Sequence, residues 1–138
     1  MPGLPPQLIN TAFASLRKTL NSYYPLSNCT WEAFRSICRC REIEKGVPLY
    51  SAGEVPTTFS YVYRGLFRIY VMDERGNEYN KNFFPEGRFP GAMAALLKGE
   101  PSRFTIDALE DSIIIEIDHQ GYRQLLNTFD DLKRYHIQ

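Results

Sequence analysis

The sequence carries no excess of charge of either sign, because its 16 lysine and arginine residues are balanced by 16 aspartate and glutamate residues. A domain that grips DNA phosphates is usually basic, so we do not expect this chain alone to bind nucleic acid. Long apolar runs are also missing, and none approaches the about 20 residues that a membrane-spanning helix needs. With 43% hydrophobic residues over 138 positions, the composition indicates one globular domain with a single core.

Cysteine is scarce as well, since the chain has only Cys29, Cys38 and Cys40, all in its first third. An odd number of cysteines without a secretory leader is typical of the reducing cytosol, so a cytoplasmic location is expected. The Cys38-Arg39-Cys40 spacing lacks a second pair of ligands, which argues against a zinc or iron–sulfur centre. We therefore expect no metal cofactor.

Helical periodicity marks both ends of the chain, where apolar residues recur three or four positions apart. The expected helices are residues 7–22, a second helix capped by Ser27 or Asn28, a single turn within residues 91–97, a helix capped by Asp118 that runs to Leu126, and a last one from Phe129 to Gln138. Residues 1–7 are rich in proline and glycine and are expected to be a flexible N-terminus. Residues 8–138 are then one domain.

Between these helices the pattern is that of short strands punctuated by glycine turns. The expected strands are residues 41–45, 48–50, 59–64, 66–73, 79–84, 103–109 and 112–117. Short strands with regular turns and almost no helices between them favour a closed roll or barrel. The predicted fold is mainly β with flanking helices, a jelly roll or double-stranded β-helix.

Five short motifs occur in a fixed order along this roll. They are Lys45-Gly46, Ser51-Ala-Gly-Glu54, Arg64-Gly65, Asp73-Glu-Arg-Gly-Asn-Glu78 and Ala108-Leu-Glu-Asp111. In this order and spacing the sequence, from about Leu26 onward, resembles the cyclic-nucleotide-binding sensor domain of Crp/Fnr-type bacterial transcription regulators. The resemblance implies an eight-stranded β-roll, a short inserted helix and a C-terminal helix that mediates dimerisation.

The resemblance also implies a phosphate-binding cassette in residues 89–104, and this sequence departs from it. In the family, an arginine, a hydroxyl and the N–H groups of a short helix meet the cyclic phosphate, while a glutamate accepts a hydrogen bond from the ribose. Aligned without gaps, the glutamate position is Ala92, the arginine position is Ser102, and Arg103 stands where the hydroxyl residue usually is. Strand side chains alternate between faces, so Arg103 is expected to point away unless the preceding loop slips by one residue. Cyclic AMP is therefore not expected to bind in the usual way.

The same alignment supplies the candidate ligand-binding residues. They are Ile69, Lys81, Gly91, Ala92, Met93, Ser102 and Arg103. Lys81 and Arg103 are basic departures that would make the pocket prefer anions, since a buried lysine needs a partner. The alternatives are that Lys81 is solvated on the outer strand face, and that Arg103 forms a surface ion pair with Asp107 or Glu100.

Three functions remain to be compared. The leading one is the sensory domain of a Crp/Fnr-type transcription regulator, in which a small anionic or nucleotide-like effector biases a homodimer. By the resemblance, DNA is then read only by a helix-turn-helix domain that this chain lacks. The second is an interaction module whose roll is filled by its own aromatic residues. The third, an enzyme of the cupin type, is not expected, because the only histidines, His119 and His136, lie outside the roll and no catalytic residue is identified.

Overall fold

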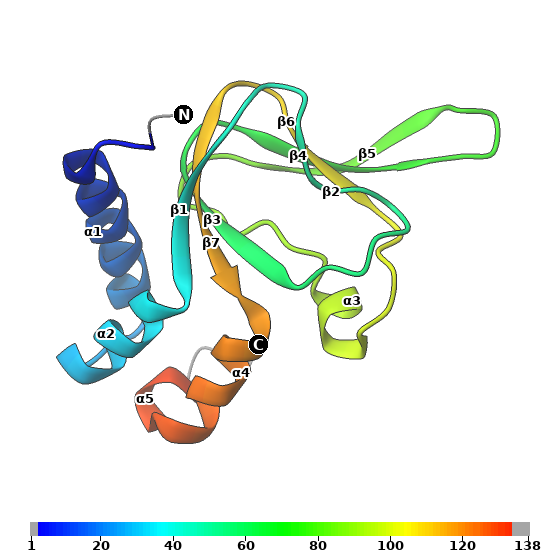
Figure 1. Ribbon diagram of the computed structural model, residues 1–138. Coiled ribbons are helices and arrows are strands. Elements are labelled where there is room, and N and C mark those ends of the chain that lie inside the picture. The colour runs from blue at the N-terminus through cyan, green and yellow to red at the C-terminus, as the bar shows by residue number, and fades with distance from the viewer. Residues whose placement is uncertain (1–2, 134–138) are drawn as a thin grey trace.

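The computed structural model describes residues 3–133, which form two β-sheets that close into a roll with helices around it (Figure 1). The elements are α1 (Pro6–Tyr23), α2 (Asn28–Ser36), β1 (Cys38–Ile43), β2 (Pro48–Tyr50), β3 (Thr58–Arg64), β4 (Phe67–Met72), β5 (Glu78–Phe84), α3 (Met93–Lys98), β6 (Thr105–Ala108), β7 (Ser112–Asp118), α4 (His119–Thr128) and α5 (Asp130–Lys133). The prediction of a mainly β roll with flanking helices is confirmed. In this part of the chain, no helix combines the length and the apolar character needed to cross a membrane.

The N-terminal helix begins earlier than expected, at Pro6. Proline suits the first helical turn, because the N–H group that it lacks would have no intrahelical partner there. Residues 6 and 7 of the expected flexible N-terminus are therefore part of α1. The hydroxyl of Tyr61 on β3 lies 2.7 Å from the Ser15 hydroxyl and 3.0 Å from that of Thr19, which fixes α1 against the sheet.

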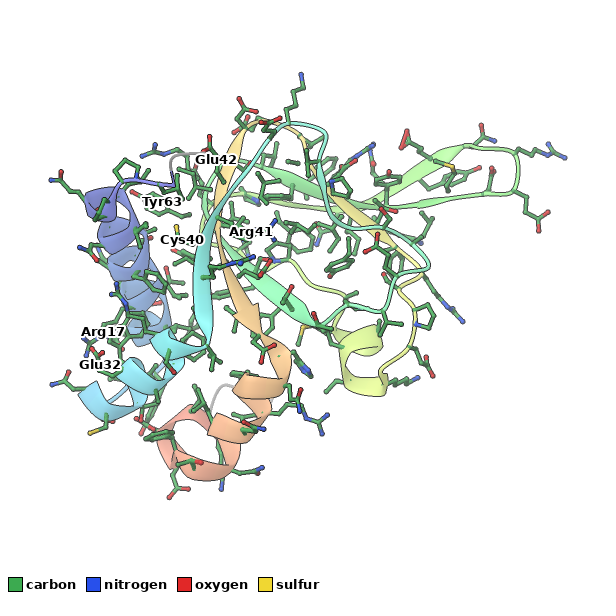
Figure 2. The ribbon with its side chains drawn as sticks, in the orientation of Figure 1. Arg17, Glu32, Cys40, Arg41, Glu42 and Tyr63 are labelled. Carbon is green, nitrogen blue, oxygen red and sulfur yellow. The ribbon has the colours of Figure 1, made fainter. Side chains whose placement is uncertain are left out.

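The two sheets have the strand orders β1-β7-β3 and β2-β6-β4-β5. On the central strand β7, Ile114 faces the interior of the roll, whereas Ile115 and Ile117 face the helices. The same alternation holds on β1 and β3, where Cys40 and Tyr63 lie on the side that faces α1 and Arg41 points the other way, toward Glu116 (Figure 2). One apolar cluster therefore lies inside the roll, and a second joins the roll to the helices.

Seven strands are assigned within residues 3–133, not the expected eight. The missing strand is the segment 87–90, which runs beside the free edge of β3. The N–H groups of Ser60 and Val62 donate to the carbonyl oxygens of Pro90 and Arg88, each at 3.0 Å. Pro90 has no N–H to continue this ladder, so the segment is an irregular strand that delivers the chain to α3.

The C-terminal helices α4 and α5 contact the N-terminal helix α2. Asp118 caps α4 as expected, since its carboxylate accepts the N–H of Gly121 at 2.8 Å. The helix expected from Phe129 to Gln138 is described only as α5, because residues 134–138 lie outside the described residues. On α5, Asp131 accepts the N–H of Ser27 at 3.0 Å and the hydroxyl of Thr30 at 2.7 Å. This carboxylate joins α5 to the first turn of α2.

Replacing Asp131 by alanine is expected to lower the free energy of unfolding at neutral pH by about 1 kcal/mol, as for other lost helix caps. Partial burial opposes ionisation of Asp131, but the hydrogen bonds from Ser27 and Thr30 outweigh it and lower the pKa of this carboxyl. A lowered pKa stabilises the folded state above the unfolded-state pKa, and that contribution is lost as the pH falls through the folded-state pKa.

Urea unfolding of the wild-type and variant proteins between neutral and acid pH tests this expectation, and the two stability curves should converge in acid. The matched control is Asp130→Ala, because Asp130 is the neighbouring carboxylate, its side chain is 98% exposed, and among residues 3–133 its one ion pair is with Lys133 on the same helix. Equal losses in the two variants would contradict the role of Asp131.

Candidate functional site

A cavity of about 410 Å³ opens beside α3, between β4 and the segment that leads into β6. It is lined by Ile69, Gly91, Ala92, Met93, Ala94, Ala95, Lys98, Glu100, Pro101, Ser102, Arg103 and Phe104. We call it the cassette cavity. Six of the seven predicted ligand-binding residues lie on it, and Lys81 does not. The fold therefore brings Ile69 of β4 together with both halves of the predicted cassette.

The chain enters α3 through two residues that pack closely against the roll. A Cβ atom added at Gly91 would lie 2.8 Å from the Cβ of Phe59, so only glycine fits there without movement. The N–H of the next residue, Ala92, donates to the hydroxyl of Tyr50 on β2. Tyr50 is 6% exposed, and its burial raises the pKa of the phenol to about 12, against the opposing effect of the Ala92 N–H. The phenol therefore stays neutral and fixes the start of α3 to β2.

Removing this hydroxyl is expected to destabilise the fold. In the Tyr50→Phe variant the buried N–H of Ala92 loses its acceptor, which costs about 1–3 kcal/mol of unfolding free energy. Tyr79→Phe is the matched control, because the Tyr79 hydroxyl donates to Asp73 on an exposed hairpin and its loss should change stability by less than about 0.5 kcal/mol. Thermal unfolding followed by circular dichroism compares them, and equal melting temperatures would show that Tyr50 does not hold α3.

The expectation that Arg103 turns away from the cavity is wrong. It assumed that the strand begins at Arg103, whereas β6 begins at Thr105. The Ser102 hydroxyl donates to the carbonyl oxygen of Phe104 at 2.7 Å and accepts the N–H of Phe104 at 3.0 Å, which closes a tight loop. Strand alternation does not apply within this loop, and both Ser102 and Arg103 line the cavity.

The guanidinium of Arg103 is exposed and has no ion pair with any carboxylate among the described residues. The expected pair with Asp107 does not form, because Asp107 is bound to Arg68 at 2.9 Å. The expected pair with Glu100 does not form either. The cavity lining holds two cations, Lys98 and Arg103, against one carboxylate, Glu100. Its charge therefore favours an anion.

Lys81 is exposed on β5, and a β-bulge explains why it does not reach the cavity. Ile69 pairs with Asn82 and Tyr70 pairs with Asn80, so Lys81 is an extra residue with no partner on β4. A bulge breaks the alternation of faces along a strand. The ungapped alignment that placed Lys81 on the pocket wall therefore has the wrong register from this residue.

Sequence reasoning missed Tyr50 and Phe59, which hold the start of α3 in place. No local signal identifies them, because each acts on residues more than 30 positions away in the sequence. Within residues 3–133, no group of three histidine, cysteine, aspartate or glutamate side chains is arranged to hold a metal ion. Cys38 and Cys40 are half-buried free thiols, and burial raises the pKa of Cys38 to about 12, although nearby Arg35 opposes this.

Several solved structures share this fold. The sensor domain of the transcriptional regulator DNR from Pseudomonas aeruginosa superposes with a TM-score of 0.78 at 18% identity, over 91% of this chain and 85% of that one. The Thermus thermophilus Catabolite Activator Protein superposes with a TM-score of 0.69 at 19% identity, over 81% of this chain and 52% of that one. The c-di-GMP responsive global regulator CLP from Xanthomonas campestris superposes with a TM-score of 0.64 at 20% identity, over 74% of this chain and 49% of that one. The chain thus spans about half the length of the last two proteins.

No curated protein matches the sequence. The model of the cyclic nucleotide-binding domain matches residues 40–129, which include every strand of the roll except the first two residues of β1. This range also contains α3 and the whole lining of the cassette cavity. The chain therefore belongs to the cyclic nucleotide-binding domain family.

Proposed function

We propose that this domain is the effector-sensing part of a Crp/Fnr-type transcription regulator and that its effector is a small anion bound in the cassette cavity. The observation that carries the proposal is that Arg103 lines that cavity, is exposed, and has no ion pair among the described residues. An arginine with no protein partner is free to form a charge-assisted hydrogen bond with a carboxylate or phosphate. The wall of the cavity around Arg103 includes the other predicted residues Gly91, Ala92, Met93, Ser102 and Ile69.

Cyclic AMP bound in the usual way does not fit this lining well. Ala92 offers a methyl group where a ribose hydroxyl needs an acceptor, and the Ser102 hydroxyl is already bonded to the backbone of Phe104. Leaving the ribose hydroxyl without its acceptor costs about 1–3 kcal/mol of binding free energy. One protein with this fold is named for its response to c-di-GMP. This supports the view that domains of this fold are not restricted to cyclic AMP as their ligand.

The output of such a sensor passes through its C-terminal helices. Asp131 links α5 to α2, and the ring of Tyr122 on α4 packs against Phe59 of β3, so the C-terminal helices are connected to the strand that packs against Gly91. By analogy with the family, we expect a cytoplasmic protein that is a homodimer in its full-length form and binds DNA through a helix-turn-helix domain. We expect no catalytic activity and no cofactor other than the effector.

The alternative function is an interaction module with a self-filled roll. That alternative requires a closed, dry core beside residues 91–103. A cavity of about 410 Å³ in this place, with Arg103 on its rim, favours the sensing function instead.

Thermal unfolding in the presence of single anionic metabolites tests the proposal. A ligand at about 100 times its Kd stabilises the native state by about 2.7 kcal/mol, so a true effector raises the Tm by several degrees. Arg103→Gln is expected to abolish most of this rise, and Lys81→Gln, a matched loss of an exposed cation away from the cavity, to leave it intact. An effector that stabilises the Arg103→Gln variant as much as the wild type would refute the site.

A further inference from the structure

A second cavity, of about 330 Å³, lies where the roll meets the helices. It is lined by Leu20, Tyr23, Phe34, Phe59, Phe89, Met93, Tyr122 and Leu132. We call it the aromatic cavity, because five of these eight side chains are aromatic rings. None of its lining residues carries a formal charge, so it suits an apolar group.

The aromatic cavity and the cassette cavity share a wall. Met93 lines both of them. Gly91 lines the cassette cavity, and a Cβ atom added there would lie 2.8 Å from Phe59, which lines the aromatic cavity. The two cavities therefore meet at Met93, whose unbranched side chain is flexible, and lie close together at Gly91, which has no side chain. Met93 is 44% exposed, so it is not locked in the core.

The rim of the aromatic cavity leaves large apolar groups in water. Tyr23 at the end of α1 is 67% exposed, and Met93 at the start of α3 also lines the cavity and is 44% exposed. The floor is well packed by contrast, since Phe34 and Leu132 are buried. An exposed apolar rim above a firm floor is typical of a binding site, because a ligand that covers the rim removes apolar surface from water.

We infer that the two cavities are two ends of one ligand site and that the effector is an aromatic organic anion. Its carboxylate, sulfonate or phosphate group meets Arg103, and its flat apolar body passes Met93 into the aromatic cavity. This inference rests on the proposed function, because it assumes that the cassette cavity binds the effector. It also explains why alanine stands at position 92 in place of the family's glutamate, since a ligand without a ribose needs no acceptor there.

The same arrangement connects the ligand to the C-terminal helices. Tyr122 of α4 and Leu132 of α5 line the aromatic cavity. The neighbour of Leu132, Asp131, is hydrogen-bonded to the first turn of α2. A ring inserted in the aromatic cavity therefore touches both helices that lead to the C-terminal end of the domain, whereas a small anion held only at Arg103 touches neither.

Calorimetric titration of the whole 138-residue chain tests the inference with three probes. Naphthalene-2-sulfonate carries both groups, sulfate carries only the charge, and 2-naphthol carries only the ring. We expect naphthalene-2-sulfonate to bind at one site, about tenfold or more tighter than either of the others. Arg103→Gln should weaken it about tenfold and leave 2-naphthol unchanged, whereas Tyr23→Ser should weaken both aromatic probes and leave sulfate unchanged.

Both substitutions are at exposed side chains, and Lys81→Gln is the matched control that should change nothing. Two molecules of naphthalene-2-sulfonate per chain, or a variant pattern in which only one substitution weakens it, would overturn the inference. If an anion binds through Arg103 and the ring adds no affinity, the inference fails while the proposed function stands. If no anion of any kind depends on Arg103, both fail.

Discussion

Replacing Gly65 by alanine is expected to lower the free energy of unfolding by about 3 kcal/mol or more, the largest single effect on stability that we foresee. Gly65 is buried and has φ +117°, which alanine adopts only with strain. An added Cβ atom would lie 2.0 Å from the Oγ of Ser112 and 2.9 Å from its Cα. Because the second of these atoms is backbone, the strand β7 itself would have to move, and such overpacking adds about 1–3 kcal/mol to the strain.

The position of Gly65 in the roll explains the crowding. β3 belongs to the three-stranded sheet and β4 to the four-stranded one, and only Gly65 and Leu66 separate them. The chain crosses from one sheet to the other at this point, directly over the start of β7. The N–H of Gly65 is also held by the carboxylate of Glu86 at 3.0 Å, so the turn is fixed from two sides.

Gly76→Ala is the matched control for this substitution. Gly76 has a similar φ of +86°, and a Cβ atom there meets nothing within 4 Å. It therefore measures the backbone strain alone, which is about 1 kcal/mol. Urea unfolding measures the loss of unfolding free energy in each variant, and the difference between the two losses gives the contribution of crowding at Gly65. Equal losses of stability would contradict the close approach of Gly65 to Ser112.

The features that sequence predicted correctly are those set by neighbouring residues. Alternation and glycine turns located the strands of the roll to within a few residues, because period and turn chemistry are local properties. The cap at Asp118 and the short helix after Gly91 were found for the same reason. Gly65 entered the prediction as the break between two strands and, with Arg64, as a family motif, and its close approach to Ser112 gives the physical reason for a glycine there.

The features that sequence could not predict depend on register or on distant contacts. The bulge at Lys81 shifts the strand by one residue, and nothing in the run Asn80-Lys81-Asn82 announces it. The loop at Ser102 keeps Arg103 out of the strand through side-chain bonds to the backbone, which a count of alternating residues does not see. The aromatic cavity takes its lining from five helices, one strand and the segment before α3. Only the fold brings these residues together.

Replacing Ala92 by glutamate is expected to raise the affinity of the domain for cyclic AMP by about tenfold or more. The wild-type domain should bind this nucleotide more weakly than the low-micromolar range, because no side chain at position 92 accepts the ribose hydroxyl. A carboxylate there supplies the acceptor that the family uses, and a hydrogen bond to a charged group contributes about 1.5–3 kcal/mol. Arg103, which lines the same cavity, remains available for the phosphate.

Ala94→Glu is the matched control, because Ala94 lies on α3 and lines the same cavity as Ala92, the N-cap residue of that helix, but is two residues beyond the glutamate position. It adds the same negative charge near the site and should weaken binding of an anion slightly. Calorimetric titration of both variants with cyclic AMP and with 2′-deoxy cyclic AMP, which lacks the ribose hydroxyl, isolates the new hydrogen bond. An equal gain in affinity for the two nucleotides would mean that position 92 does not face a ribose. The same conclusion would follow if the Ala92→Glu variant gains no affinity although its circular dichroism spectrum and melting are those of a folded domain. The cassette cavity would then bind its effector in a geometry unrelated to that of cyclic nucleotides, as an aromatic anion anchored at Arg103 requires.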